Sequence, residues 1–478
     1  MKGINPIVAQ ITNSPSAKLA AKLADNPMVK AATQMANNPM VKAATRISRI
    51  AQPYAEALQN LSHIEWIGKI PKCWDIVKTK RIFQNNKQVA GKHAGDYERL
   101  ALTMNGVIKR NKDDAEGLQP ESFDGYQVLE QNQLVFKLID LENVKTSRVG
   151  LSPYTGIVSP AYIVLKNTQA DNRFFYYYYM NMYYQEIFNY MGGEGVRSAL
   201  NAKDLLEVPL PNISIPEQQA IADYLDGECA RIDGIVEKQR QIIEKLKEYK
   251  KSVITEAVTR GLNPDAPMKD SGIEWIGKIP EHWEIIKTKR VFQNNKQVAG
   301  KQAGDYERLA LTMNGVIKRD KDDADGLQPE SFEGYQVLEE NQLVFKLIDL
   351  ENVKTSRVGL SPYTGIVSPA YIVLKNTHVD NRFFYYYYMN MYYQEIFNYM
   401  GGEGVRSALN AKDLLEVPLP KISMTEQQAI ADYLDGECAR IDGIVEKRER
   451  MMELMTEYKK SLIYECVTGK KEIVDVVE

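Results

Sequence analysis

The sequence predicts an α+β fold in which one mixed α/β domain occurs twice and each copy continues into a long helix. Residues 64–238 match residues 273–447 at a constant offset of 209, and 160 of the 175 positions are identical. A repeat of this length indicates a duplicated domain with its own core, since about 150 residues suffice for one. A stripe of apolar residues at heptad spacing follows each copy and predicts two long helices that pair antiparallel as a coiled coil.

Composition limits the class of protein. The chain of 478 residues contains no run of eighteen apolar residues and no signal-peptide core, so we expect neither a membrane partner nor secretion. The four cysteines form no CxxC pair, which argues against a zinc site or a disulfide framework and favours a cytoplasmic location. The net charge of −3 means that any contact with DNA must come from local basic patches or from a basic partner.

Residues 1–62 have no counterpart in the second copy. They are rich in alanine and carry seven Lys or Arg residues against two acidic ones. The eight letters of residues 26–33 recur at residues 38–45, each time beginning with Asn-Pro, which suits the start of a helix. We therefore expect a short helical N-terminal extension or a mobile arm. A helical surface that docks a partner subunit or touches DNA is the alternative to a passive arm.

Residues 63–216 form the first mixed domain, and residues 273–425 form the second. Apolar, β-branched runs such as residues 134–139 and 162–165 predict short strands, and pairs of Gly, Pro, Asn and Asp residues between such runs predict turns. A helix is expected over about residues 172–190. Strands and helices of this length justify the α+β assignment for each copy.

The long helices are expected over residues 217–260 and 426–469, with a linker at residues 261–272 and a tail at residues 470–478. A helix of this length cannot bury its apolar stripe on a small domain alone, so we expect the two stripes to bury each other. The residues predicted to pair are Leu225, Ile232, Ile235, Ile242 and Leu246 in the first helix and Leu434, Ile441, Ile444, Met451 and Met455 in the second.

Several phrases in the chain resemble landmarks of type I restriction-modification specificity subunits. Residues 273–284 resemble the opening of a recognition domain, and residues 261–264 resemble the connector between repeats. Residues 156–162 and 208–211, followed by Glu-Gln-Gln at residues 217–219, resemble further landmarks. These phrases occur in this order, and a long helix follows each copy, so the resemblance as a whole is specific.

The resemblance covers about Ile64 to Val467 and implies two target-recognition domains separated by two antiparallel helices. It implies a non-catalytic subunit that binds double-stranded DNA and directs methyltransferase (modification) subunits and restriction/translocase subunits to it. S-adenosylmethionine, ATP and Mg would then belong to those partner subunits, and no cofactor would be bound by this chain.

The chain departs from the family in one respect. Family members usually carry two different recognition domains and read asymmetric sites, whereas the two domains here are nearly identical. Antiparallel helices would relate the two copies by a two-fold axis, so we expect a bipartite DNA site that is an interrupted palindrome.

Candidate DNA contacts lie in three segments of each copy and on one lysine after a strand. In the first copy the segments are residues 99–110, which suit a hairpin with a polar and basic tip, residues 145–156, which suit an exposed polar loop between strands, and the glycine-rich residues 192–198. Arg suits guanine, Asn suits adenine, and loops on a rigid scaffold commonly carry recognition. An ordinary solvated turn is the alternative for the first two segments, and an ion pair of Arg197 with Glu194 or Asp204 is the alternative for the third. The tyrosines at residues 176–179 fit a core or a partner interface better than base stacking. The candidates are Arg99, Thr103, Asn105, Lys109, Arg110, Lys137, Arg148, Ser152, Tyr154 and Arg197, with Arg308, Thr312, Asn314, Lys318, Arg319, Lys346, Arg357, Ser361, Tyr363 and Arg406 in the second copy.

Catalysis by the chain itself finds no support in the sequence. There is no Walker A loop, no Asn/Asp-Pro-Pro-aromatic methyltransferase motif and no cluster among the four histidines. Glu248 and Lys250 resemble a nuclease Glu-x-Lys pair, but they lie on the heptad helix. Two rival classes stay open: a non-DNA coiled-coil scaffold with two identical protein-binding heads, and a nuclease whose site has no recognisable motif.

Overall fold

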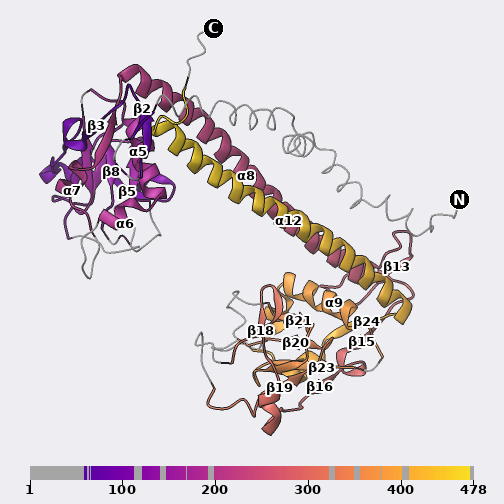
Figure 1. Ribbon diagram of the computed structural model, residues 1–478. Helices are drawn as coiled ribbons and strands as arrows, with labels where there is room; N and C mark the ends of the chain where they lie inside the picture. The colour runs from indigo at the N-terminus through magenta and orange to yellow at the C-terminus, as the bar shows by residue number, and fades with distance from the viewer. Residues whose placement is uncertain are drawn as a thin grey trace. The chain divides into compact units, whose positions relative to one another are not determined.

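The computed structural model describes residues 59–61, 64, 66–111, 121–139, 141, 147–167, 169–191, 199–321, 329–348, 356–376, 378–400 and 408–473. The expected N-terminal extension lies almost wholly outside these residues. The described residues divide into two compact units, residues 59–240 with 449–473 and residues 241–448. We call them the first-copy unit and the second-copy unit. Each holds one mixed domain and parts of both long helices, which confirms the predicted fold class (Figure 1).

The first-copy domain is built from short strands around one main helix. Its elements are β1 (Gln59–Leu61), β2 (Lys69–Pro71), β3 (Asp75–Lys78), β4 (Gln84–Asn85), β5 (Arg99–Thr103), β6 (Gly106–Arg110), β7 (Gln127–Leu129), β8 (Leu134–Phe136), β9 (Val149–Leu151), β10 (Gly156–Val158), β11 (Ile163–Lys166), α5 (Asn172–Tyr184), α6 (Ile187–Met191), α7 (Ala202–Leu206) and β12 (Pro209–Asn212). Eight strands form two four-stranded sheets, ordered β6-β5-β10-β7 and β4-β11-β8-β9.

The second-copy domain repeats this arrangement strand for strand. Its elements are β13 (Met268–Asp270), β14 (Lys278–Pro280), β15 (Glu284–Lys287), β16 (Gln293–Asn295), β17 (Arg308–Thr312), β18 (Gly315–Arg319), β19 (Gln336–Leu338), β20 (Leu343–Phe345), β21 (Val358–Leu360), β22 (Gly365–Val367), β23 (Ile372–Lys375), α9 (Asn381–Tyr393), α10 (Ile396–Met400), α11 (Ala411–Leu415) and β24 (Pro418–Lys421). Its sheets are ordered β18-β17-β22-β19 and β16-β23-β20-β21.

The two sheets of a domain share an apolar core. Val135 of β8 and Val164 of β11 belong to one buried cluster with Leu100 and Leu102 of β5, which lies in the other sheet. Phe136, the next residue of β8, belongs to a different cluster that contains the aromatic residues of α5. Because successive side chains of a strand point to opposite faces, the sheet that holds β8 is covered on both sides. This explains why β8 and β11 are continuous apolar runs.

The aromatic run of α5 lines the core of the domain. Asp171 caps the helix by accepting a hydrogen bond from the backbone N–H of Arg173. Tyr178 and Tyr179 are fully buried, and the hydroxyl of Tyr179 lies 2.9 Å from Thr79 Oγ1. These two tyrosines are core residues, which confirms the interpretation that their helical spacing favoured.

The single helix expected over residues 172–190 is in fact two helices. α5 ends at Tyr184 and α6 begins at Ile187. Between them Glu186 has a φ of 58°, a left-handed backbone that side chains other than glycine rarely adopt. The break redirects the chain so that Phe188 returns to the core.

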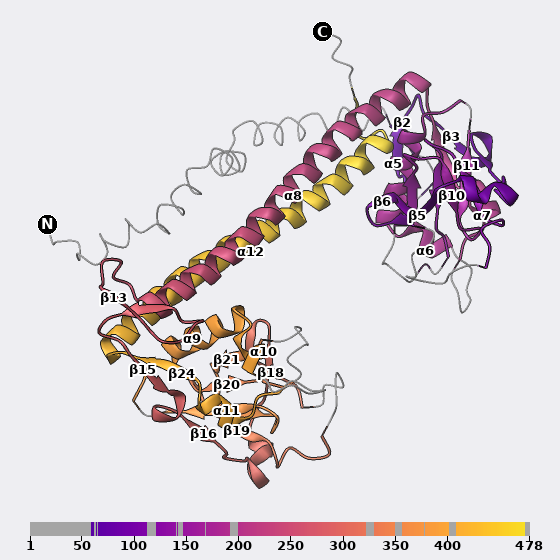
Figure 2. The same ribbon diagram turned by 180° about the vertical axis from the view of Figure 1, so that it is seen from behind.

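The two long helices are continuous elements, α8 (Ile215–Arg260) and α12 (Met424–Val467), of 46 and 44 residues. In the first-copy unit, Lys459 Nζ of α12 lies 2.6 Å from a carboxylate oxygen of Asp233 on α8. Further along the chain, Lys471 Nζ donates to the hydroxyl of Tyr224, which lies earlier on α8, at 2.7 Å. As the residue number rises from Lys459 to Lys471, the residue contacted on α8 falls from Asp233 to Tyr224, so the two segments run antiparallel (Figure 2).

In the second-copy unit the same pairing is made by the other ends of the helices. Lys250 Nζ of α8 lies 2.6 Å from a carboxylate oxygen of Asp442 on α12. Val258, later on α8, shares a buried cluster with Ile430, which lies earlier on α12. The expected antiparallel helices are therefore confirmed within each unit. Among the described helices, none is both long and apolar enough to cross a membrane.

The apolar seam of the helices differs in detail from the predicted one. Half of the predicted residues are buried, namely Leu225, Ile232, Leu246, Leu434 and Ile441, and half are only partly buried, namely Ile235, Ile242, Ile444, Met451 and Met455. Ile243 is buried where Ile242 was expected. A straight helix has 3.6 residues per turn, so a seven-residue pattern drifts off the contact face along a helix of this length. The prediction of buried pairing residues is therefore wrong at the five partly buried positions.

Candidate nucleic-acid interface

A β hairpin presents two exposed side chains at its tip. β5 and β6 pair antiparallel with Thr103 opposite Gly106. Gly106 has a φ of 88°, a conformation that favours glycine, and Thr103 Oγ1 donates to the Gly106 carbonyl oxygen at 3.0 Å. The turn exposes Asn105 and Met104, of which Met104 is 57% exposed. The hairpin predicted over residues 99–110 is therefore confirmed, and Thr103 holds its turn.

The second copy repeats the hairpin. Thr312 Oγ1 donates to the Gly315 carbonyl oxygen at 3.0 Å, and Gly315 has a φ of 92°. Met313 and Asn314 stand exposed at the tip. The two tips therefore offer the same amide and the same apolar side chain.

A second predicted segment meets the hairpin. Lys109 on β6 places its Nζ 5.3 Å from the centre of the Tyr154 ring, and Lys318 lies at the same distance from Tyr363. An ammonium group over an aromatic face at this distance is a cation–π contact. The structure thus brings together two stretches of chain that sequence reasoning had singled out separately. Both side chains remain exposed, so they are available to a ligand.

The expectation of an exposed polar loop over residues 145–156 is wrong for most of the described residues 147–156, although residues 153–155 are exposed. β9 (Val149–Leu151) lies inside this stretch, and strand pairing buries the residues on either side of it. Arg148 is 3% exposed, and its Nη1 donates to the Ile139 carbonyl oxygen at 3.2 Å. Ser152 is 2% exposed, and its Oγ donates to the Tyr154 carbonyl oxygen at 2.7 Å. Arg148 and Ser152 hold the fold, and we withdraw them as DNA contacts.

Arg99 is also buried. It is 9% exposed, and its guanidinium carbon lies 5.5 Å from the centre of the Phe123 ring. A guanidinium stacked on an aromatic ring is held by packing, so it is not presented to a duplex. The matching residues of the second copy are buried as well and make the same contacts, so they are not candidates for DNA contact either. They are Arg308, Arg357 and Ser361.

The remaining candidates divide between half-buried and undescribed residues. Lys137 and its counterpart Lys346 are half-buried, and their backbone N–H groups donate to the carbonyl oxygens of Arg148 and Arg357 at 3.0 Å. Arg110 and Arg319 are half-buried at the ends of β6 and β18. Arg197 and Arg406 lie outside the described residues, as do the glycines around them.

Sequence reasoning missed several exposed lysines that precede the hairpin. Lys87 and Lys92 are exposed between β4 and β5. Lys78 and Lys80 are also exposed, but both pair with Glu207, at 2.7 and 2.6 Å. These hydrogen bonds lower the pKa of Glu207 to about 2, so its carboxylate is charged at neutral pH. The Lys-x-Lys-Arg run at residues 78–81 is the feature of the sequence that indicates a basic surface before the hairpin.

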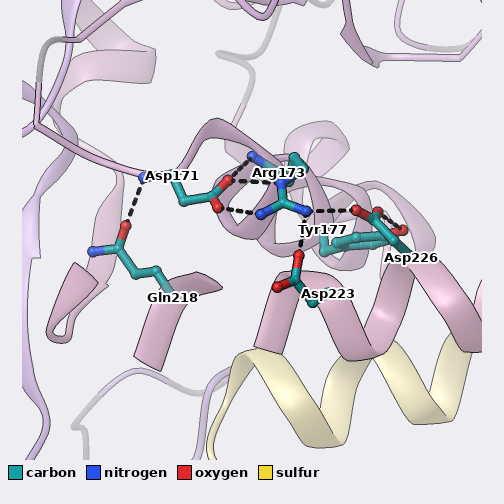
Figure 3. Close-up of polar contacts among 6 residues, drawn as sticks. All are labelled: Asp171, Arg173, Tyr177, Gln218, Asp223 and Asp226. Atoms are coloured by element: carbon teal, nitrogen blue, oxygen red, sulfur yellow. Dashed lines mark hydrogen bonds and ion pairs between the residues drawn. The ribbon is translucent and has the colours of Figure 1, made fainter. Parts of the chain in front are cut away.

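A polar network joins the domain to its long helix, and no local sequence signal indicated it. Figure 3 shows Arg173, in the first turn of α5, between Asp171 of its own domain and two aspartates of α8. Its guanidinium lies 2.7 Å from Asp171, 2.5 Å from Asp223 and 3.0 Å from Asp226. These carboxylates, Asp171 foremost, raise the pKa of Arg173. We call Asp171, Arg173, Asp223 and Asp226 the domain–helix clamp.

Two hydrogen bonds made by uncharged side chains complete the clamp. Tyr177 on α5 donates its hydroxyl hydrogen to Asp226 at 2.7 Å, and burial together with this bond raises the pKa of Tyr177. Gln218 on α8 accepts a hydrogen bond from the Asp171 backbone N–H at 2.9 Å. The domain is therefore tied to α8 through side chains spread over the first turns of both helices (Figure 3).

The arrangement offers hydrogen-bond donors and cations at two tips that carry the same residues. Within the part of the chain that the structure describes, no three His, Cys, Asp or Glu side chains are grouped so as to hold a metal ion. An exposed amide and an exposed ammonium on a rigid hairpin suit base edges and phosphates.

Comparison with known protein families and structures places this geometry in context. The family model described as "Type I restriction modification DNA specificity domain" matches residues 75–248 and 280–446. The two matched segments fall one in each copy of the repeat, and together they cover well over half of the chain.

Individual relatives agree with the family match. The chain is 25% identical over 426 residues to a protein of Methanocaldococcus jannaschii described as the MjaX specificity subunit of a type I restriction enzyme, covering 84% of this chain and 95% of that protein. The MjaVIII specificity subunit of the same organism is 25% identical over 283 residues, 55% of this chain and 62% of that protein. A chain from a structure of a type I R-M system superposes with a TM-score of 0.61 at 11% identity, covering 84% of this chain and all of that one, and so shares the fold.

Proposed function

Because the chain belongs to the type I restriction modification DNA specificity domain family, we propose that it is the DNA-specificity subunit of a type I restriction-modification complex. It selects the DNA and performs no chemistry itself. The observation that carries this assignment is the duplicated hairpin, which repeats one exposed set of Asn, Met and Lys side chains in each copy of the family domain. A protein-binding scaffold has no comparable observation in its favour.

Near identity of the two domains supports a symmetric target. Side chains that read base edges decide which bases a domain selects, and the exposed tips carry the same residues in the same hairpin. Each domain should therefore select the same half-site. Since α8 and α12 run antiparallel within both units, we propose that the half-sites are inverted and that the full site is an interrupted palindrome.

Partner subunits supply the chemistry in this proposal. Methyltransferase subunits using S-adenosylmethionine, and restriction/translocase subunits using ATP and Mg, act at the site that this chain selects in the cytoplasm. The paired helices offer a surface for such a partner, since Met451, Leu454 and Tyr458 lie three and seven residues apart on one face of α12. Leu454 is 54% exposed and Tyr458 47% exposed there, so this face of α12 offers apolar surface to a partner.

Purification of the tagged chain from its own cells tests the proposal. We expect methyltransferase and restriction subunits to copurify, and the complex to bind one duplex sequence with an affinity that falls steeply as salt rises. A chain that copurifies with neither subunit and binds all duplexes alike would reject the proposal in favour of a protein-binding scaffold. Cleavage of DNA by the chain alone, abolished by a point substitution, would instead indicate a nuclease.

A further inference from the structure

One arginine in each copy joins a recognition domain to its long helix. We infer that Arg173 and Arg382 are positioning residues that fix the angle between each domain and its helix, and through it the spacing of half-sites that the protein accepts. The inference rests on the proposed function, because spacing has a meaning only for a bipartite DNA site. Neither arginine is assigned a contact with DNA.

The chemistry of the guanidinium group makes it a directional link. Its donors lie in one rigid plane, so it holds several carboxylates only at a fixed mutual angle. In the first copy it spans Asp171 on the domain side and both Asp223 and Asp226 on α8. Asp223 and Asp226 are three residues apart, so they lie on one face of the helix. A rotation of the domain about α8 would lengthen at least one of these contacts.

Apolar packing at the same junction does not impose an angle so strictly. Phe174 of α5 shares a buried cluster with Ile221 and Leu225 of α8. Burial of apolar surface is non-directional, so such a contact tolerates a small rotation that a hydrogen bond does not. In the second copy, a hollow of about 280 Å³ lies at this junction, lined by Tyr386 and Asp435 among others. This hollow opens to solvent beside the clamp, so the directional contacts at the junction are the polar ones.

The second copy builds the same clamp from its own residues. Arg382 lies 2.8 Å from Asp380, 2.7 Å from Asp432 and 2.9 Å from Asp435, and the hydroxyl of Tyr386 donates to Asp435 at 2.7 Å. These distances agree with those of the first copy to within 0.2 Å, the largest difference being 2.5 against 2.7 Å. Equal clamps give each domain the same angle to its helix, as an inverted repeat of half-sites requires.

The clamp is retained where the adjoining sequence is not. The two residues before Asp171 are Gln169 and Ala170, and the matching residues of the second copy are His378 and Val379. The two copies thus differ directly beside the clamp and share every clamp residue. This pattern fits a shared geometric task.

Binding to a series of duplexes that differ only in spacer length tests the inference. The protein is the full chain with the subunits that purify with it, and the variant is Arg173→Gln with Arg382→Gln. For the wild type, we expect the preferred spacer to bind about tenfold more tightly than spacers one base pair shorter or longer. In the variant this preference should fall to about threefold or less. The affinity of the variant for the preferred spacer should stay within about threefold of the wild-type affinity, and the half-site sequence that it selects should not change.

Two further variants separate positioning from a general structural role. Arg231→Gln with Arg440→Gln removes exposed ion pairs to Glu228 and Glu437 on the same helices, in which no residue of the domains takes part, and should leave the spacer preference unchanged. Arg173→Lys with Arg382→Lys keeps the charge without the planar fork, and its spacer preference should fall between those of the wild type and the glutamine variant.

Three results would overturn the inference. An unchanged spacer preference in the glutamine variant would show that packing alone sets the angle. An equal loss of affinity for every spacer would show that the clamp only stabilises the fold. A wild-type complex that binds no bipartite site would overturn the proposed function, and this inference with it.

Discussion

The duplicated domains and the far halves of the long helices have diverged to different extents. The domains and helix starts share 160 of 175 positions, whereas residues 239–260 and 448–469 share only 10 of 22. The domains carry the hairpin tips, and the far helix halves mainly supply apolar residues to a seam. Base edges accept few substitutions, but a seam accepts many side chains of similar volume. The contrast fits sequence selection by the domains and a supporting role for the helix seam.

Substitutions at the hairpin tips should cause the largest loss of DNA affinity, and the loss should be nearly equal in the two copies. Replacing Asn105 and Lys109, and their counterparts Asn314 and Lys318, by Ala should cost about 2 kcal/mol of specific binding per copy. The combined variant should bind its site roughly a thousandfold more weakly, measured by gel shift at fixed salt.

Single-copy versions of this variant sharpen the comparison. Each should lose about thirtyfold in affinity, and the two losses should agree within about twofold because the tips are identical. Lys203→Ala, at an exposed position of α7, is the matched control and should bind as the wild type does. Clearly unequal losses would show that the two domains do not read the same half-site.

The helix seam should respond to volume, equally in both units. Leu225→Ala and Leu434→Ala remove fully buried side chains, so each should lower the free energy of unfolding by about 3 kcal/mol. Ile243→Ala should cost more than Ile242→Ala, because only Ile243 is buried. Urea unfolding followed by circular dichroism measures these changes. If Ile242 proved the costlier of the two positions, the seam described here would be incorrect.

The smallest expected effect is a difference between the two units in how their stability depends on pH. Lys470 belongs to the first-copy unit, and the residue 209 positions before it, which lies in the second-copy unit, is Gly261. Burial lowers the pKa of Lys470 to about 8 from its ordinary 10.5. Between these two values the unfolded chain binds more protons than the folded chain, so stability rises with pH in this window. The gain should be about 1 kcal/mol at most, since Lys470 is partly exposed and screened by solvent.

Thermal unfolding of the full chain between pH 7.5 and 10.5 measures this effect. Lys470→Met should remove the rise with pH and leave the second-copy unit unaffected. Parallel curves for the wild type and the variant would show that the lysine keeps its ordinary pKa in the folded chain.

Sequence reasoning succeeded where the pattern was periodic or repeated. The offset of 209 defined both domains, and the heptad stripe placed the long helices within two residues of α8 and α12. The Asn-Gly pair at residues 105–106 identified the hairpin, because only a few residue types suit its turn. These features depend on neighbours in the sequence.

It failed where distant residues decide the outcome. β9 has only three residues, so its burial of Arg148 and Ser152 depends on pairing with β8, which the local sequence does not reveal. The clamp of Arg173 joins residues some fifty positions apart and has no motif. The meeting of Lys109 with Tyr154 likewise arises from the sheet, and it could not be foreseen from either segment.

Genome-wide mapping of methylated adenines in cells that carry only this specificity subunit tests the central claim most directly. Because both domains present the same tip, the account predicts a single interrupted palindrome with one spacer length. Deletion of the gene for this chain should abolish methylation of that palindrome. Two unrelated half-sites, or methylation that persists without the chain, would contradict the account.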